Sequence, residues 1–151
     1  MDTQGTPQQV LIEQQMLRHI TSALRTTMEW KYQGSDFSRK LSSLRFVAES
    51  FQRHLKRLMD LEEADGYMAL VLESRPQLNQ EIETLRQEHE QFRSLLPQIM
   101  GSLQRVSPTS PESMTNILDE LTALLVKLDA HGKKETKLLQ EALLTDEGGE
   151  G

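Results

Sequence analysis

Four long segments, in which apolar residues recur at every third or fourth position, constrain this sequence more than any other feature. They cover approximately residues 7–32, 37–64, 76–105 and 111–144. This spacing places apolar side chains along one face of an α-helix. Gly34, Asp65-Gly66 and the linker Ser107–Pro111 supply turn or helix-start signals between the segments. Short links make neighbouring helices antiparallel, so the sequence predicts an all-α, up-down-up-down antiparallel four-helix bundle.

The same pattern predicts the limits of the folded unit. We expect one domain over residues 9–144, with disordered tails at 1–8 and 145–151. Residues 67–73 are expected to form a short helical turn before the third long helix. Pro97 should kink that third helix, because proline lacks the backbone N–H that the helix needs. The apolar face of the first helix is expected to contain Leu11, Ile12, Met16, Ile20, Ala23 and Leu24.

Composition excludes several classes of function. The chain has 151 residues, no cysteine and a formal net charge of −6, so disulfides and thiolate ligands are ruled out. The lack of a basic stripe argues against nucleic-acid binding. There is no apolar run long enough to span a bilayer and no signal-peptide pattern at the N-terminus, so we expect a cytoplasmic protein that does not bind membranes. Motifs of hydrolases, kinases and dinucleotide-binding proteins are also missing.

The four histidines of the chain are divided among the predicted helices, one to each: His19, His54, His89 and His131. Counted from the turns, they fall at similar heights along the bundle. All four lie on or beside an apolar stripe, so we expect them to point inward and form one layer. Buried imidazoles need partners, and neutral imidazole is a common metal ligand. The sequence therefore predicts a metal site inside the bundle.

Carboxylates are expected to complete this site. Glu135 follows His131 by four residues, which places both side chains on one helix face. Glu62 lies two turns after His54 on roughly the same face. For Glu62, a position in the metal site and a position in solvent are both open. For Tyr67, contact with the site is open as well.

Other residues near the histidines are expected to stay outside the ligand set. Glu88 and Glu90 flank His89, so they should point away from it toward the surface. The methionines are scattered, which suits core filling better than copper binding.

Three short segments carry a resemblance to a known family. Phe51-Gln-Arg-His54-Leu, Glu88-His89-Glu90 and Leu128-Asp-Ala-His131-Gly-Lys-Lys-Glu135, in this order, resemble the hemerythrin-like (HHE cation-binding) family over about residues 9–144. The resemblance implies a four-helix bundle that holds a non-heme di-iron centre. It implies binding of dioxygen, sensing of nitric oxide or redox state, or supply of iron to damaged iron–sulfur clusters. It also implies a set of metal ligands: His19, His54, His89, His131 and Glu135. Glu62 is not part of that pattern, but it could add a further carboxylate if the second helix presents it inward.

The sequence departs from the family pattern at two positions. The second helix reads His54-x-x-x-Leu58 where the family has a glutamate, and Arg93 stands where oxygen-carrying members often have a second histidine. Two irons normally need more ligands than remain here. One metal, a weakly bound pair and a different metal are therefore alternatives, although the octahedral N/O preference of iron fits this ligand set better than tetrahedral zinc.

Several functions remain in competition at this point. The leading hypothesis is an iron-binding protein that handles dioxygen, nitric oxide or redox stress, rather than an enzyme. A catalytic version would activate oxygen or peroxide at open coordination positions. A bundle without metal would act as a structural or protein-interaction module, and heme ligation by two histidines is a fourth reading. The oligomeric state is open, with monomer and weak dimer both compatible with the exposed faces.

Overall fold

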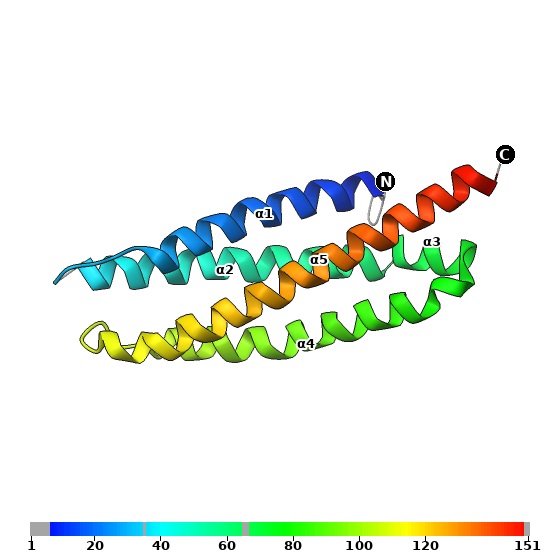
Figure 1. Cartoon of the computed structure of the whole chain (residues 1–151). Helices are drawn as coiled ribbons and strands as arrows, with labels where there is room; N and C mark the ends of the chain where they lie inside the picture. Colours follow the sequence, from blue (N-terminus) through cyan, green and yellow to red (C-terminus); the bar gives the residue numbers. More distant parts are fainter. Residues whose placement is uncertain (1–6, 35, 65–66, 150–151) are drawn as a thin grey trace.

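Four long helices run side by side in alternating directions (Figure 1). The computed structural model describes residues 7–34, 36–64 and 67–149. The long helices are α1 (Pro7–Glu29), α2 (Asp36–Glu63), α4 (Asn79–Gln104) and α5 (Thr115–Gly149). The short helix α3 (Tyr67–Ser74) and two 3-10 turns, Pro76–Leu78 and Pro111–Met114, lie in the connections. Within the described ranges there is no strand, and the predicted all-α four-helix bundle is confirmed.

The long helices pair unevenly. α1 packs along α2, α4 packs along α5, and α2 also packs along α4, whereas α1 and α5 have little mutual contact. Figure 1 shows α5 running at an angle to α2, with the end of α5 on the same side of the molecule as the start of α1. The bundle is therefore closed on three sides and looser between α1 and α5.

The core is formed by large apolar side chains that repeat along each helix. On α2 the buried positions follow steps of three and four residues through Leu41, Leu44, Ala48, Phe51 and Leu55. Each fully buried leucine or phenylalanine contributes about 1.5–3 kcal/mol relative to an exposed one. This repeated burial holds the helices in fixed rotations about their axes, and these rotations decide which polar residues face inward.

The helix α1 is rotated differently from our prediction. Leu11, Ile12 and Met16 are exposed, so the prediction that they are buried is wrong. Leu24 is buried as predicted, and the rest of the buried stripe consists of Val10 and Leu17, with the buried carboxylate Glu13 between them. Two apolar stripes run along this segment, and packing against α2 selects the second one.

The ends of the elements agree with the sequence at some points and differ at others. The predicted short helix before the third long helix is confirmed as α3, and α4 continues through Pro97 to Gln104. Gly34 lies in the link between α1 and α2 and has a positive φ of 55°, which glycine adopts without steric cost. The prediction that the last helix ends near Leu144 is wrong, because α5 continues to Gly149. Of the predicted tails, residues 1–6 and 150–151 lie outside the described residues.

Two cationic side chains of α2 tie neighbouring helix ends to it. Lys40 Nζ donates to the carbonyl oxygens of Met28, at 2.8 Å, and Trp30, at 2.7 Å, near the end of α1. Burial lowers the pKa of Lys40. Arg45 donates to three carbonyl oxygens at the end of α4, those of Leu103 at 3.2 Å, Gln104 at 3.1 Å and Val106 at 2.8 Å. Helix C-termini leave carbonyls without partners, so these bonds fix where α1 and α4 end against α2.

Among the helices described, none is both long and apolar enough to cross a membrane.

Candidate metal centre

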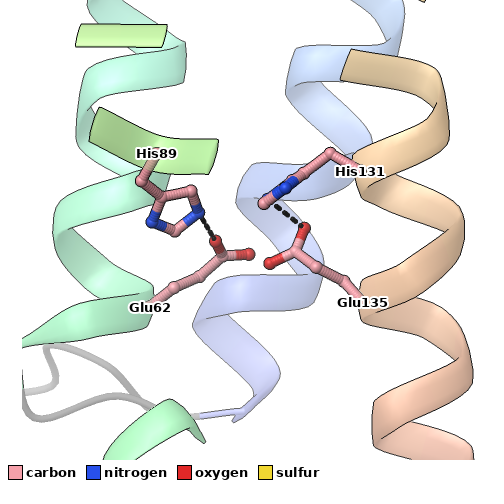
Figure 2. Close-up of side chains that lie close together, drawn as sticks. All are labelled: Glu62, His89, His131 and Glu135. Carbon is pink, nitrogen blue, oxygen red and sulfur yellow. Dashed lines mark ion pairs between the residues drawn. The ribbon is translucent and has the colours of Figure 1, made fainter. Parts of the chain in front are cut away.

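Four side chains from three helices converge inside the bundle (Figure 2). Glu62 comes from α2, His89 from α4, and His131 and Glu135 from α5. Each offers one nitrogen or oxygen atom, and these four atoms lie within 4.8 Å of one another. None of the four residues is more than 4% exposed. We call this group the His–Glu cluster.

Each residue of the His–Glu cluster occupies a position in an otherwise apolar stripe. On α2, Glu62 follows the buried Leu58 by four residues, and on α4, His89 follows the buried Leu85 by four. On α5, His131 and Glu135 are four residues apart, so both side chains project from the same face. The helical repeat that buries leucines elsewhere therefore brings these polar groups to one place.

The inner nitrogen of each cluster histidine is buried without a hydrogen bond. His89 Nε2 lies 3.1 Å from Glu62 Oε1, and His131 Nε2 lies 3.5 Å from Glu135 Oε1. These are short approaches, but neither nitrogen has an aligned hydrogen-bond partner in the described part of the chain. An unsatisfied buried polar atom is costly. A cation between these nitrogens and the carboxylates would satisfy all four groups.

The outer nitrogen of each histidine contacts a different carboxylate. His131 Nδ1 lies 2.7 Å from Glu88 Oε1, and His89 Nδ1 is bonded to Glu63. If each Nδ1 carries the proton that the carboxylate accepts, each Nε2 presents a lone pair to the cluster. Carboxylate partners of this kind are the usual support of metal-ligating histidines. The arrangement of both rings thus suits metal binding.

Cations hold these outer carboxylates in place. Arg93 Nη1 donates to Glu63 Oε2 at 3.0 Å, and Lys134 is paired with Glu88. Burial acts to raise the pKa of Glu88, but its hydrogen bonds from Lys134 and from His131 outweigh burial, and the pKa is lowered. Glu88 is therefore ionised and able to accept the proton of His131.

The two carboxylates of the His–Glu cluster share an environment that disfavours negative charge. Burial raises the pKa of Glu62 to about 7. The pKa of Glu135 is raised well above its usual value, first by burial and then by the charge of Glu62. Two adjacent buried carboxylates with raised pKa values are a strong attraction for a cation, which would compensate their charge.

Two further polar side chains orient these carboxylates. Tyr67, from α3, donates its hydroxyl hydrogen to Glu135 Oε2 at 2.7 Å, and burial raises the pKa of this tyrosine. Gln14, from α1, donates to Glu62 Oε2 at 3.3 Å. The question left open for Tyr67 is answered, because its hydroxyl contacts a residue of the cluster.

The predicted set of site residues is only partly brought together. His89, His131, Glu135 and Glu62 meet, and of the two positions open for Glu62 the buried one is observed. His19 is exposed on α1 and His54 is half-buried at the edge of the buried face of α2. His54 lines a separate hollow along α2, beside three basic residues: Arg53, Lys56 and Arg57. The prediction that all four histidines form one inward layer is therefore wrong.

Two physical reasons explain the displaced histidines. His19 lies on the face of α1 that also carries Ile12 and Met16, and this face is turned to solvent. His54 is eight residues before Glu62, a distance of about 12 Å along a helix. The connection through α3 allows α4 to begin beyond the end of α2, so His89 lies level with Glu62 rather than with His54.

Three residues of the site were missed from the sequence: Glu63, Glu88 and Gln14. The expectation that Glu88 lies on the surface is wrong, because its side chain is only 20% exposed and contacts His131. Glu90, by contrast, is exposed as expected. Glu88 directly precedes His89, so its contact with α5 could be predicted only from the rotation of α4 about its axis. The sequence does not give this rotation. The carboxylate that seemed lost at Leu58 is supplied one turn later by Glu62.

A cavity of about 590 Å³ adjoins the His–Glu cluster and is lined mainly by α1 and α5. Its lining includes all four cluster residues and Gln14. A cation held here would thus be ligated by protein on one side and face a cavity on the other. Such an arrangement leaves coordination positions for a small ligand.

Comparison with known proteins gives one family. The family model described as Hemerythrin HHE cation binding domain matches residues 10–143, nearly the whole chain. Searches of curated proteins and of solved structures gave no match.

Proposed function

The chain belongs to the family of the Hemerythrin HHE cation binding domain, and from this premise we propose that its His–Glu cluster binds non-heme iron. The observation that carries the proposal is the pair of buried, unpartnered Nε2 atoms of His89 and His131, which face two carboxylates. Imidazole nitrogens and carboxylate oxygens together suit iron, and the chain has no cysteine that would favour a softer metal.

The number of irons is a separate part of the proposal. Ligands on opposite sides of one ion are about 4 Å apart at ordinary bond lengths of roughly 2.1 Å. The four ligand atoms, all within 4.8 Å of one another, therefore fit around a single ion after a small inward movement. The di-iron centre that the family resemblance implies would have to be held by the same two histidines and two carboxylates, His89, His131, Glu62 and Glu135. We propose one firmly bound iron as the minimum.

We further propose that the bound iron serves to handle dioxygen, nitric oxide or a redox signal. The cavity beside the His–Glu cluster would admit a small molecule, and Tyr67 and Gln14 would hold the carboxylates in place while it binds. Iron would supply the affinity for the diatomic ligand. The residues of the chain would orient the ligands and limit access of water.

The test is the metal content and visible absorption spectrum of protein purified without a histidine tag. The protein is measured as isolated and after anaerobic addition of ferrous iron. We expect one to two irons per chain and a spectrum that changes on exposure to dioxygen or nitric oxide. Protein that stays free of metal after this treatment would contradict the proposal and favour a structural or interaction module. Iron that binds without any response to either gas would leave metal binding in place and reject gas handling.

A further inference from the structure

The cavity between α1 and α5 has the dimensions of a small-molecule site. Its volume of about 590 Å³ falls within the range of roughly 300–1,000 Å³ that is typical of ligand pockets. One wall comes from α1 and includes Arg18, Thr21 and Arg25, while the facing wall comes from α5. The four residues of the His–Glu cluster form part of the lining. We call this space the α1–α5 cleft.

Short side chains explain why the cleft is open. Thr21 and Ser22 on α1, with Gly132 and Thr136 on α5, all line it. A Cβ atom added at Gly132 would meet no other atom within 4 Å. Small residues at these positions leave space where larger apolar ones would have joined the two helices, as they do between α1 and α2.

The inner walls of the cleft are apolar. They are formed mainly by leucines of three helices: Leu17, Leu55, Leu58, Leu125 and Leu128. Leu58 lies one turn before Glu62, so the apolar wall continues to the His–Glu cluster. Walls of this kind favour a ligand with a hydrocarbon portion.

The outer lining is basic, although the chain as a whole has a net charge of −6. The basic lining residues are Arg18, Arg25, Lys133 and Lys137. Lys133 is paired with Asp129 at 3.3 Å, but Arg18, Arg25 and Lys137 have no acidic partner within the described ranges. These three unpaired cations make the mouth of the cleft electrostatically suited to an anion.

The cleft also continues along the two helices. A second hollow of about 210 Å³ shares Arg25 and Leu125 with it and extends to Met28 on α1 and Leu118 on α5. The combined space is therefore elongated parallel to the helices. An extended chain fits this shape better than a compact ring system.

We infer that the α1–α5 cleft binds a small organic anion with a hydrocarbon chain, such as a medium-chain carboxylate. Its carboxylate pairs with Arg18 or Arg25 in the outer lining, and its chain lies against the leucines. The inference rests on the proposed function in one respect: the proposed iron centre would lie beside the bound anion. The binding itself depends on the cleft, so it can be tested without metal.

The test is calorimetric titration of metal-free, chelator-treated protein with decanoate and, separately, with decanol. We expect saturable binding of one decanoate per chain and at least 10-fold weaker binding of decanol, because decanol lacks the charge. The double substitution Arg18→Gln with Arg25→Gln should weaken decanoate binding about 10-fold and leave decanol binding unchanged. The matched control is Arg39→Gln, which removes an exposed arginine of α2 that does not line the cleft, and it should have no effect.

A second variant tests the cleft by filling it. Gly132→Leu adds a side chain into open space and suits a helix, so the protein should fold and give an unchanged circular dichroism spectrum. Decanoate binding should be lost.

Equal binding of decanoate and decanol, no effect of the arginine substitutions, or binding only to anionic phospholipid vesicles would each overturn the inference. Iron binding is measured separately, on untreated protein and after anaerobic addition of ferrous iron, and this separates the two proposals: iron binding without decanoate binding rejects the cleft ligand, and decanoate binding without iron binding rejects the metal centre.

Discussion

At the scale of single residues, the two kinds of histidine in this chain should behave differently toward metal. His89 and His131 present buried, unpartnered Nε2 atoms to the His–Glu cluster, whereas His19 is exposed and the unpartnered Nδ1 of His54 lies outside the cluster. We expect His89→Ala to reduce the iron content from one or more per chain to near zero, because one of four ligands is lost. His19→Ala and His54→Ala serve as matched controls and should keep the wild-type content. Loss of iron in either control would show that the cluster is not the complete site.

Glu63 and Glu88, the carboxylates bonded to the Nδ1 atoms of His89 and His131, should change the affinity for iron without being ligands. Glu88→Gln removes the charged acceptor of His131 Nδ1–H, so the imidazole becomes a poorer donor to the metal. We expect iron affinity to fall about 10- to 100-fold, measured by competition with a chromophoric chelator. Glu83→Gln, an exposed change on the same helix, is the control and should leave the affinity unchanged. An unchanged affinity in Glu88→Gln would mean that the ring is oriented by packing against Phe92 instead.

The raised pKa of Glu62 predicts a pH dependence of the metal-free protein. Its pKa is about 7 in the folded chain against an ordinary value of 4.5, so folding retains a proton that the unfolded chain releases. The contribution to the free energy of unfolding is fully present below pH 4.5 and is lost as pH rises through about 7. We expect urea unfolding to show a decrease on the order of 1–3 kcal/mol across this window.

The matched variant for this pH dependence is Glu62→Gln. Glu62→Gln removes this titrating group and, with it, the charge that helps to raise the pKa of Glu135, so the comparison covers both effects. The Glu62 contribution is the difference between the two profiles, and parallel profiles would contradict it. Iron affinity should change in the opposite sense and rise through about pH 7, because ligand carboxylates bind metal without their protons.

At the scale of helices, Arg45 should be a main determinant of how α4 ends. Its guanidinium is bonded to three carbonyl oxygens of the residues 103–106, in and just beyond the last turn of α4. Arg45→Met keeps much of the apolar stem but removes these bonds, and we expect a loss of about 1–3 kcal/mol in the free energy of unfolding. Arg39→Met, an exposed arginine of the same helix, is the control and should change stability by less than about 0.5 kcal/mol. Equal effects of the two substitutions in chemical denaturation would reject this role for Arg45.

At the scale of the whole molecule, metal binding should stabilise the bundle as a unit. The ligands come from α2, α4 and α5, and Gln14 links α1 to Glu62, so the complete set exists only in the folded chain. Iron at about 100 times its dissociation constant would add about 2.7 kcal/mol, which corresponds to roughly 5–10 °C in melting temperature for a chain of this size. Calorimetry with and without chelator measures the shift. Glu135→Ala is the control, and a similar shift in that variant would place the ion elsewhere.

Helical periodicity and local spacing determined much of this protein without any tertiary information. The alternation of four long apolar repeats with turn signals was sufficient for the bundle, because an amphipathic helix must bury its stripe against another helix. The pair His131 and Glu135 was predictable for the same reason, since residues four apart share a helix face. His89 and His131 were also predicted to lie at the same height along the bundle, because the link between α4 and α5 is short.

Tertiary packing decided the remaining features. Two apolar stripes compete on α1, and the choice between them turned His19 to the solvent and Gln14 to Glu62. The height of α4 depends on how far α3 carries the chain beyond the end of α2, and at this height His89 lies beside Glu62 and not beside His54. A sequence specifies which residues share a face of one helix. The rotation and height of that helix depend on the side chains of its neighbours, so residues on different helices meet only as packing dictates.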